Sequence, residues 1–261
     1  LSLVMNSDIL DMQIGVAQQI LLQARSAIEQ FGNPEMRAQY RDALYVAMNG
    51  WLLVAPQGGD HQLALVRNML AVARTDEHVA QLKRWFEGKE VPVGLTLDTD
   101  LRWSFVSRLV SLGALPESTI DEELARDNTA GGERQAAAAR AAIGTAEAKA
   151  AAWSAAIDSN DLANALLSST VGGFSQPDQR ELLKPYVDKY FEMLPQIWKT
   201  RTNEIAQTIT TGFFPTLLAS QEILDKADAF LKVDTDAGCT RLIRELRDSV
   251  ARSLRCQAAD K

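Results

Sequence analysis

Alanine dominates one stretch of the chain and limits what that stretch can form. Thirteen of the 22 residues from Gln135 to Ala156 are alanine, which is the strongest helix former and the smallest side chain that still carries a Cβ. Helices rich in alanine can pack toward the short end of the roughly 8–10 Å range of helix-helix distances. The stretch therefore predicts tightly stacked helix pairs rather than a loose bundle.

The surrounding region, residues 96–153, has the pattern of four short helices in quick succession. Each is preceded by a side-chain oxygen that can accept a backbone N–H of the following turn. The predicted caps are Asp98 or Thr99, Ser118, Thr129 and Thr145. Glycines that can separate the helices lie in the gaps, namely Gly113, Gly131 with Gly132, and Gly144.

The rest of the chain continues this pattern. Apolar residues recur at three- and four-residue spacing, for example over residues 7–31, 36–51, 159–170 and 236–257, and no segment alternates as a strand would. Gly172-Gly173 and Pro195 are predicted to end helices. About a dozen short helices with small connectors are typical of HEAT-like or ARM-like solenoids. We predict an all-α fold, a curved α-α superhelix of short antiparallel helix pairs, with residues 1–261 as a single domain.

Composition excludes several classes of protein. The net charge is −7 with both signs interspersed, which argues against a nucleic-acid or anionic-membrane surface. No apolar run approaches the length of a membrane span. The chain starts without methionine or a signal-like segment, so we expect a fragment of a longer, cytoplasmic protein. Cys239 and Cys256 have no ligand-like neighbours, and we expect both to be reduced.

Arg102 is the first candidate for a functional residue. In the helix predicted after Asp98, three serines and Arg108 form a polar stripe, and Arg102 lies nearly opposite its centre, on the side that protein should cover. A covered guanidinium needs a partner. One reading is a structural ion pair with Asp98, Asp100 or a carboxylate on a neighbouring helix. The other is that Arg102 faces an internal cavity and binds a carboxylate or carbonyl group of a ligand.

Three further residues are weaker candidates. Arg134 opens an alanine helix whose other side chains are too small to contact a substrate, so its guanidinium can project into a cavity. Tyr186 and Tyr190 lie one turn apart on a predicted helix. Aromatic residues at that spacing are usually core, and stacking on a ligand is the alternative.

Several words of the sequence resemble a known family over residues 7–259. They are DTDLRW at 98–103, ELARD followed by TAGGERQAAAARAA, GTAEAKAAAW at 144–153, PQGGDHQL at 56–63, VGGFSQPDQRELLKPYVDKYF at 171–191 and NEIAQTI at 203–209. These long, ordered words resemble the C-terminal helical domain of bacterial aminopeptidase N. That family comprises zinc aminopeptidases related to the endoplasmic-reticulum aminopeptidases.

The resemblance prompts a search for catalytic motifs in this chain. The zinc-binding word H-E-x-x-H is absent: His61 is followed by Gln62, His78 by Val79, and the chain has no other histidine. The family's G-x-M-E-N loop is also missing, as are a G-x-S-x-G elbow and a phosphate-binding loop. We therefore expect neither enzymatic activity nor a metal or other cofactor in this chain by itself.

The resemblance implies that zinc and catalysis belong to a preceding catalytic domain of the same polypeptide. Its C-terminal helical domain would close over that site and form a chamber that admits peptides. Arg102, Arg134, Tyr186 and Tyr190 would then be candidates to face the substrate. The alternative from another class is a free-standing helical scaffold that binds a protein partner on its concave face.

Overall fold

A computed structural model describes residues 2–5, 7–159, 162–233 and 235–260. Within these ranges all regular structure is helical and no strand occurs, which confirms the predicted all-α class. The elements are α1 (Ser2–Met5), η1 (Ile9–Asp11), α2 (Ile14–Ser26), η2 (Ala27–Phe31), α3 (Arg37–Val54), α4 (Asp60–Val72), α5 (Asp76–Phe86), α6 (Thr99–Ser111), α7 (Ser118–Arg126), α8 (Ala130–Ala142), α9 (Ala146–Ile157), α10 (Asn164–Phe174), η3 (Pro177–Gln179), α11 (Arg180–Leu183), α12 (Tyr186–Thr200), α13 (Asn203–Gly212), η4 (Thr216–Leu218), α14 (Gln221–Phe230) and α15 (Ala237–Ala259).

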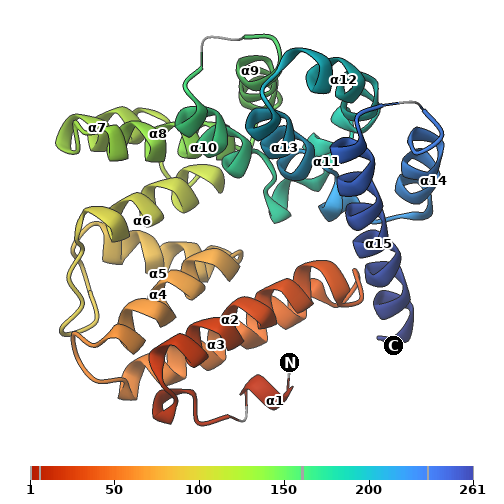
Figure 1. The fold of residues 1–261 in the computed structure, drawn as a ribbon. Helices are drawn as coiled ribbons and strands as arrows, with labels where there is room; N and C mark the ends of the chain where they lie inside the picture. The colour runs from red at the N-terminus through yellow and green to blue at the C-terminus, as the bar shows by residue number, and fades with distance from the viewer. Residues whose placement is uncertain (1, 6, 160–161, 234, 261) are drawn as a thin grey trace.

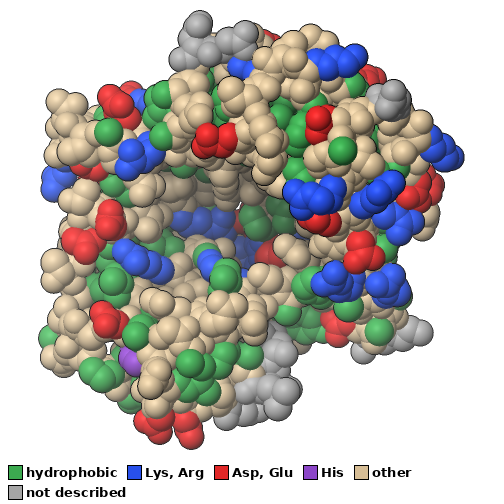
Figure 2. Space-filling model, in the orientation of Figure 1, with side chains coloured by type: hydrophobic (Ala, Val, Ile, Leu, Met, Phe, Trp, Pro, Cys, Tyr) green, Lys and Arg blue, Asp and Glu red, His purple; other side chains and the backbone are tan. Residues whose placement is uncertain are grey.

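The helices follow a curved path whose two ends meet. In Figure 1 the chain passes from α2 and α3 through α6 to α8 and α10, then through α12 to α15, which returns toward the beginning of the chain. The last turn of α15 contacts η2. There the Asp260 carboxylate accepts hydrogen bonds from the backbone N–H of Asn33 at 2.8 Å and from the Tyr40 hydroxyl at 3.2 Å. The arrangement surrounds a hollow, which Figure 2 shows near the centre of the molecule.

Two large apolar cores and a smaller one hold this path together. One core joins α2 to α6, another joins the helices from α9 onward, and the smallest lies between α6, α7 and α8. Helix α6 contributes to two of them: Leu101 and Phe105 pack into the first, and Trp103 and Val106 into the smallest. Because α6 is covered on both sides, it links the N-terminal helices to the alanine-rich ones.

Most predicted caps are present. Asp98 accepts a hydrogen bond from the Leu101 N–H, and Thr129 and Thr145 cap α8 and α9 in the same manner. The prediction for Ser118 is wrong, because α7 begins at that residue, Glu117 precedes it and no side-chain cap bond forms.

The glycine pairs lie inside helices, which corrects the prediction that they separate helices. Gly131 and Gly132 belong to the first turn of α8, and Gly172 and Gly173 to the end of α10. A Cβ on Gly173 would lie 2.1 Å from the backbone oxygen of Ala138 in α8. The pair α8 and α10 therefore packs so closely that one backbone lies against the other.

Three other predictions need correction. Pro195 lies within α12 rather than at its end. The helix predicted over 159–170 begins at Asn164 in the structure, and residues 160 and 161 lie outside the described residues. The buried face of α3 is also shifted. The apolar spacing over residues 36–51 predicts an inner face of Met36, Tyr40, Leu44, Ala47 and Trp51, whereas the structure buries Arg41, Leu44, Tyr45, Met48 and Leu52.

Candidate functional site

Arg102 forms an ion pair within the chain. Its Nε and Nη2 atoms donate to the two carboxylate oxygens of Glu123 on α7, at 2.8 and 2.6 Å. The side chain of Glu123 is only 3% exposed and that of Arg102 is 20% exposed. The guanidinium also lies over the ring of Phe86, and the hydrogen bond with Glu123 raises the pKa of Arg102. This is the structural ion pair with a neighbouring helix that the sequence allowed. Contact with substrate stays a prediction.

The other three candidates have very different surroundings. Arg134 is exposed on α8, and its guanidinium makes no ion pair or hydrogen bond with the described residues. Tyr186 is half-buried on α12 between Trp153 and Phe174, with ring centroids 5.0 and 5.1 Å away. It also lines a small cavity of about 120 Å³.

Tyr190 is a core residue. Its side chain is 0% exposed, and its hydroxyl donates to the backbone oxygen of Thr210 at 2.7 Å. Burial raises the pKa of Tyr190 well above its usual value. A substrate on the molecular surface would not reach this ring in the described conformation. The two tyrosines belong to the core formed from α9 onward, whereas Arg102 contacts α5 and α7, so the four candidates do not form one site.

The structure instead gathers a charged cluster that the sequence did not predict. We call the following residues the central charged cluster: Glu29, Arg37, Arg41, Arg108, Asp178 and Arg180. They come from η2, α3, α6, η3 and α11, which are far apart in the sequence. Four arginines thus surround two carboxylates, and the cluster carries an excess of positive charge.

Asp178 lies between two arginines of this cluster. Its Oδ1 atom pairs with Arg41 and its Oδ2 atom lies 2.7 Å from Nη2 of Arg108. Burial alone would raise the pKa of Asp178, but Arg108 and Arg41 together hold the pKa below its usual value. Glu29 similarly pairs with Arg41 and, at 2.8 Å, with Arg180.

One sequence signal for this cluster was available. Arg41 shares helical spacing with Leu44, Tyr45, Met48 and Leu52, so a charged residue lies on the buried face of α3. Buried arginines normally have carboxylate partners. The partner Asp178, however, is 137 residues away, and no local pattern indicates that distance.

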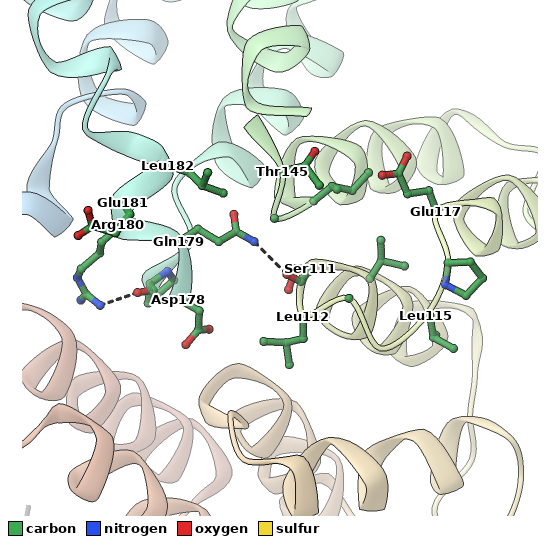
Figure 3. A pocket seen from close by; sticks show the side chains of 16 residues that line it. Ser111, Leu112, Leu115, Glu117, Thr145, Asp178, Gln179, Arg180, Glu181 and Leu182 are labelled. Atoms are coloured by element: carbon green, nitrogen blue, oxygen red, sulfur yellow. Dashed lines mark hydrogen bonds between the residues drawn. The ribbon is translucent and has the colours of Figure 1, made fainter. Parts of the chain in front are cut away.

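A pocket of about 750 Å³ adjoins the cluster. It lies between the end of α6, the connection to α7, the turn between α8 and α9, and the segment from η3 to α11. Figure 3 shows this segment facing the end of α6, with the Gln179 side chain crossing toward Ser111. Asp178 and Arg180 line the pocket and also belong to the central charged cluster.

Comparison with known proteins identifies the family of this fold. The sequence profile of the family described as "ERAP1-like C-terminal domain" matches residues 4–252. The chain belongs to the ERAP1-like C-terminal domain family. It is 42% identical to Aminopeptidase N of Streptomyces lividans over 261 residues, which are 100% of this chain and 30% of that protein. The ERAP1-like C-terminal domain thus spans about a third of the length of its relative.

The histidines of this ERAP1-like C-terminal domain do not suit a zinc site. His61 Nε2 lies 2.9 Å from the backbone oxygen of Met12, and the His78 ring stacks on Tyr45 with centroids 3.6 Å apart. Across the described ranges, no group of three or more His, Cys, Asp or Glu residues is placed to hold a metal ion. None of the described helices is long and apolar enough to cross a membrane.

Proposed function

We propose that this chain is the non-catalytic C-terminal domain of a zinc-dependent aminopeptidase. It closes over the catalytic domain of the same polypeptide, forms the wall of a peptide chamber, and helps to admit and position peptides for removal of the N-terminal residue. Zinc and the hydrolytic step belong to the catalytic domain. The residues of this chain bind and orient the part of the peptide beyond the scissile bond.

The closed path of helices around a hollow is the observation that carries this proposal. A HEAT-like curvature produces a concave wall without long mobile loops. Figure 2 shows Lys and Arg side chains on the floor of the hollow. A positively charged floor attracts the carboxylates of a peptide. Closure of such a wall also removes water from a reacting site.

The similarity to an aminopeptidase supports the proposal over a free-standing scaffold. The relative is about three times as long as this chain, so most of its sequence lies outside the region compared. On this proposal the chain works only as part of a longer polypeptide, with a cytoplasmic location.

Photo-crosslinking of a peptide in the full-length enzyme tests the proposal. The peptide carries a blocked scissile bond and a benzophenone side chain five or more residues from its N-terminus. We expect crosslinks within residues 1–261 that disappear when excess unlabelled peptide is added. Crosslinks confined to the catalytic part of the polypeptide would show that this domain does not contact peptide. The free benzophenone amino acid serves as the control for non-specific labelling.

A further inference from the structure

The pocket beside the central charged cluster has an apolar wall and few free polar groups. Its volume is about 750 Å³, and Val110, Leu112, Leu115 and Leu182 contribute aliphatic surface to it. A space of this size and character accepts a long aliphatic side chain. The charge that such a side chain should carry depends on which polar groups of the wall are already engaged.

The arginine and two of the three carboxylates in the pocket wall are already paired. Each of the three guanidinium nitrogens of Arg180 donates a hydrogen bond, to Leu217, Pro177 and Glu29 respectively. Both carboxylate oxygens of Asp178 face arginines of the central charged cluster. Glu181 pairs with Lys184 at 2.7 Å. The pocket therefore offers no free cation from its own wall.

Two acceptors remain. Glu117 lines the pocket, and its side-chain carboxylate makes no hydrogen bond or ion pair with the described residues. Gln179 is 7% exposed, and its Nε2 atom donates to the backbone oxygens of Ser111 and Ala142 at 3.0 and 2.8 Å. These two bonds fix the orientation of the carboxamide. Its Oε1 atom is buried and accepts no hydrogen bond from the described residues.

The picture of the pocket places these acceptors on opposite sides. In Figure 3 the Gln179 oxygen is turned toward the space between Leu182 and Thr145, and the Glu117 carboxylate lies across the pocket, above Leu115. A buried acceptor without a donor is unfavourable, and an unpaired carboxylate on the facing wall of the pocket favours a cation. The ligand that matches is an aliphatic chain ending in a positively charged hydrogen-bond donor.

We propose that this pocket binds the side chain of a lysine or arginine within a peptide. The aliphatic part lies against the leucines, and the cationic end lies between the Glu117 carboxylate and the Gln179 carbonyl oxygen. This inference rests on the proposed function, since it takes the ligand to be a peptide. It adds a preference among peptides that the family assignment does not supply.

A pair of matched peptides tests the inference. Acetyl-Ala-Lys-Ala-amide and acetyl-Ala-norleucine-Ala-amide differ only in the side-chain ammonium group, which is the only charge of the first peptide. Binding to the 261-residue chain is measured by NMR titration, including the side-chain amide signals of Gln179. We expect the lysine peptide to bind about three- to fivefold more tightly, the upper part of the range for a solvent-accessible ion pair, and to shift the Gln179 signals more.

Two substitutions separate the pocket from general acidity. Glu117→Gln should reduce the affinity for the lysine peptide to that for the norleucine peptide. Glu122→Gln removes the same charge from α7 at an exposed residue that does not line the pocket, and should change nothing. Both positions are exposed, so both variants should fold, which circular dichroism checks.

The outcomes distinguish this inference from the proposed function. Equal affinity for both peptides, or a Glu117→Gln variant that keeps the preference for lysine, would overturn the basic side-chain pocket and leave a peptide-binding domain. If neither peptide binds, the basic side-chain pocket is overturned, and if photo-crosslinking of the full-length enzyme also misses this chain, the proposed function fails with it. If Glu122→Gln abolishes binding of the lysine peptide, the peptide binds near Glu122 on α7 and the pocket assignment is overturned.

Discussion

Lys149 gives the sharpest test of how this fold uses buried charge. Its side chain is 0% exposed, and its Nζ atom donates to the backbone oxygens of Ala141 and Phe174 at 2.7 and 2.8 Å. These oxygens lie in the last turns of α8 and α10, where carbonyl groups have no partner within the helix. Lys149 of α9 therefore joins the ends of two helices that pack closely.

The charge on this lysine makes folding depend on pH. Burial lowers the pKa of Lys149 from the usual 10.5 to about 8. The folded state therefore binds the proton less tightly than the unfolded state does. That difference costs the folded state about 3 kcal/mol at pH 7 and about 1 kcal/mol at pH 10. The penalty is full below pH 8 and is relieved as the pH rises toward the unfolded value.

Lys149→Met keeps the aliphatic length and removes the amine. Two buried carbonyl oxygens lose their donor, which costs about 1–3 kcal/mol each, while the penalty for the buried charge disappears. At pH 7 the two effects nearly cancel. At pH 10 little of the charge penalty remains, so the stability of the wild type relative to the variant should increase by about 2 kcal/mol between pH 7 and pH 10.

Urea unfolding of both proteins at the two pH values measures this increase. The matched control is Lys199→Met, which removes an exposed lysine from α12 and should follow the wild type within about 0.5 kcal/mol at both pH values. The reasoning is refuted if the wild type and Lys149→Met differ in free energy of unfolding by the same amount at pH 7 and pH 10. Such a result would mean that burial does not change the proton affinity of Lys149.

Three other predictions concern packing, the central charged cluster and the meeting of the chain ends. Gly173→Ala should destabilise the fold by at least about 2 kcal/mol, because its Cβ would lie 2.1 Å from a backbone oxygen of α8. Gly172→Ala is the control: no atom lies within 4 Å of the Cβ it adds, so it should be neutral or stabilising by up to about 1 kcal/mol. Thermal unfolding of the two variants measures the difference. Asp178→Asn should cost about 3–5 kcal/mol near neutral pH by leaving buried arginines unpaired. Since the folded pKa of Asp178 is lowered, its contribution is lost as the pH falls through that value, so the variant should lose less stability in acid titrations. Burial and the hydrogen bond with Asp260 raise the pKa of Tyr40, so Asp260→Ala should lower this pKa. Ultraviolet titration of the phenolate measures the change. An unchanged pKa would show that the contact is absent in solution.

Helix starts were largely predictable because capping is local. A threonine or aspartate whose side chain can accept the backbone N–H three residues later favours a helix start, and Asp98, Thr129 and Thr145 cap helices in this way. Ser118 has the same local pattern, yet α7 begins at Ser118 itself, one residue earlier than a Ser118 cap predicts, and the Pro116 carbonyl accepts from the Thr119 N–H. There the connection from α6 decides the start, and a local pattern contains no information about it.

Glycine and proline were misread for a physical reason. Both residues disfavour helices when nothing else acts on them, so the prediction placed breaks at Gly172-Gly173 and Pro195. In the structure Gly173 is needed because α8 approaches within contact of its backbone, and Pro195 lies in a helix that packs into the core. Tertiary contacts outweigh a propensity of about 1 kcal/mol for glycine and about 3 kcal/mol for proline. The alanine content did indicate close packing.

The segment from η3 to α11 shows why the candidate pocket was not predictable from the sequence. These elements have only 3 and 4 residues, too few to present an apolar face that would fix their position. Directional bonds fix it instead: Asp178 binds α3 and α6, Gln179 binds the ends of α6 and α8, and Arg180 binds η2.

Each of these bonds joins residues that are at least 37 positions apart, so the sequence shows the donors and acceptors without showing which ones meet. The same three residues line the pocket. The position of this wall is therefore set by the ion pairs of Asp178 and Arg180 and by the carboxamide of Gln179. A substitution that releases Asp178 should move the wall that carries Gln179, and so should weaken binding of a lysine peptide even though neither carboxylate oxygen of Asp178 is free to touch it.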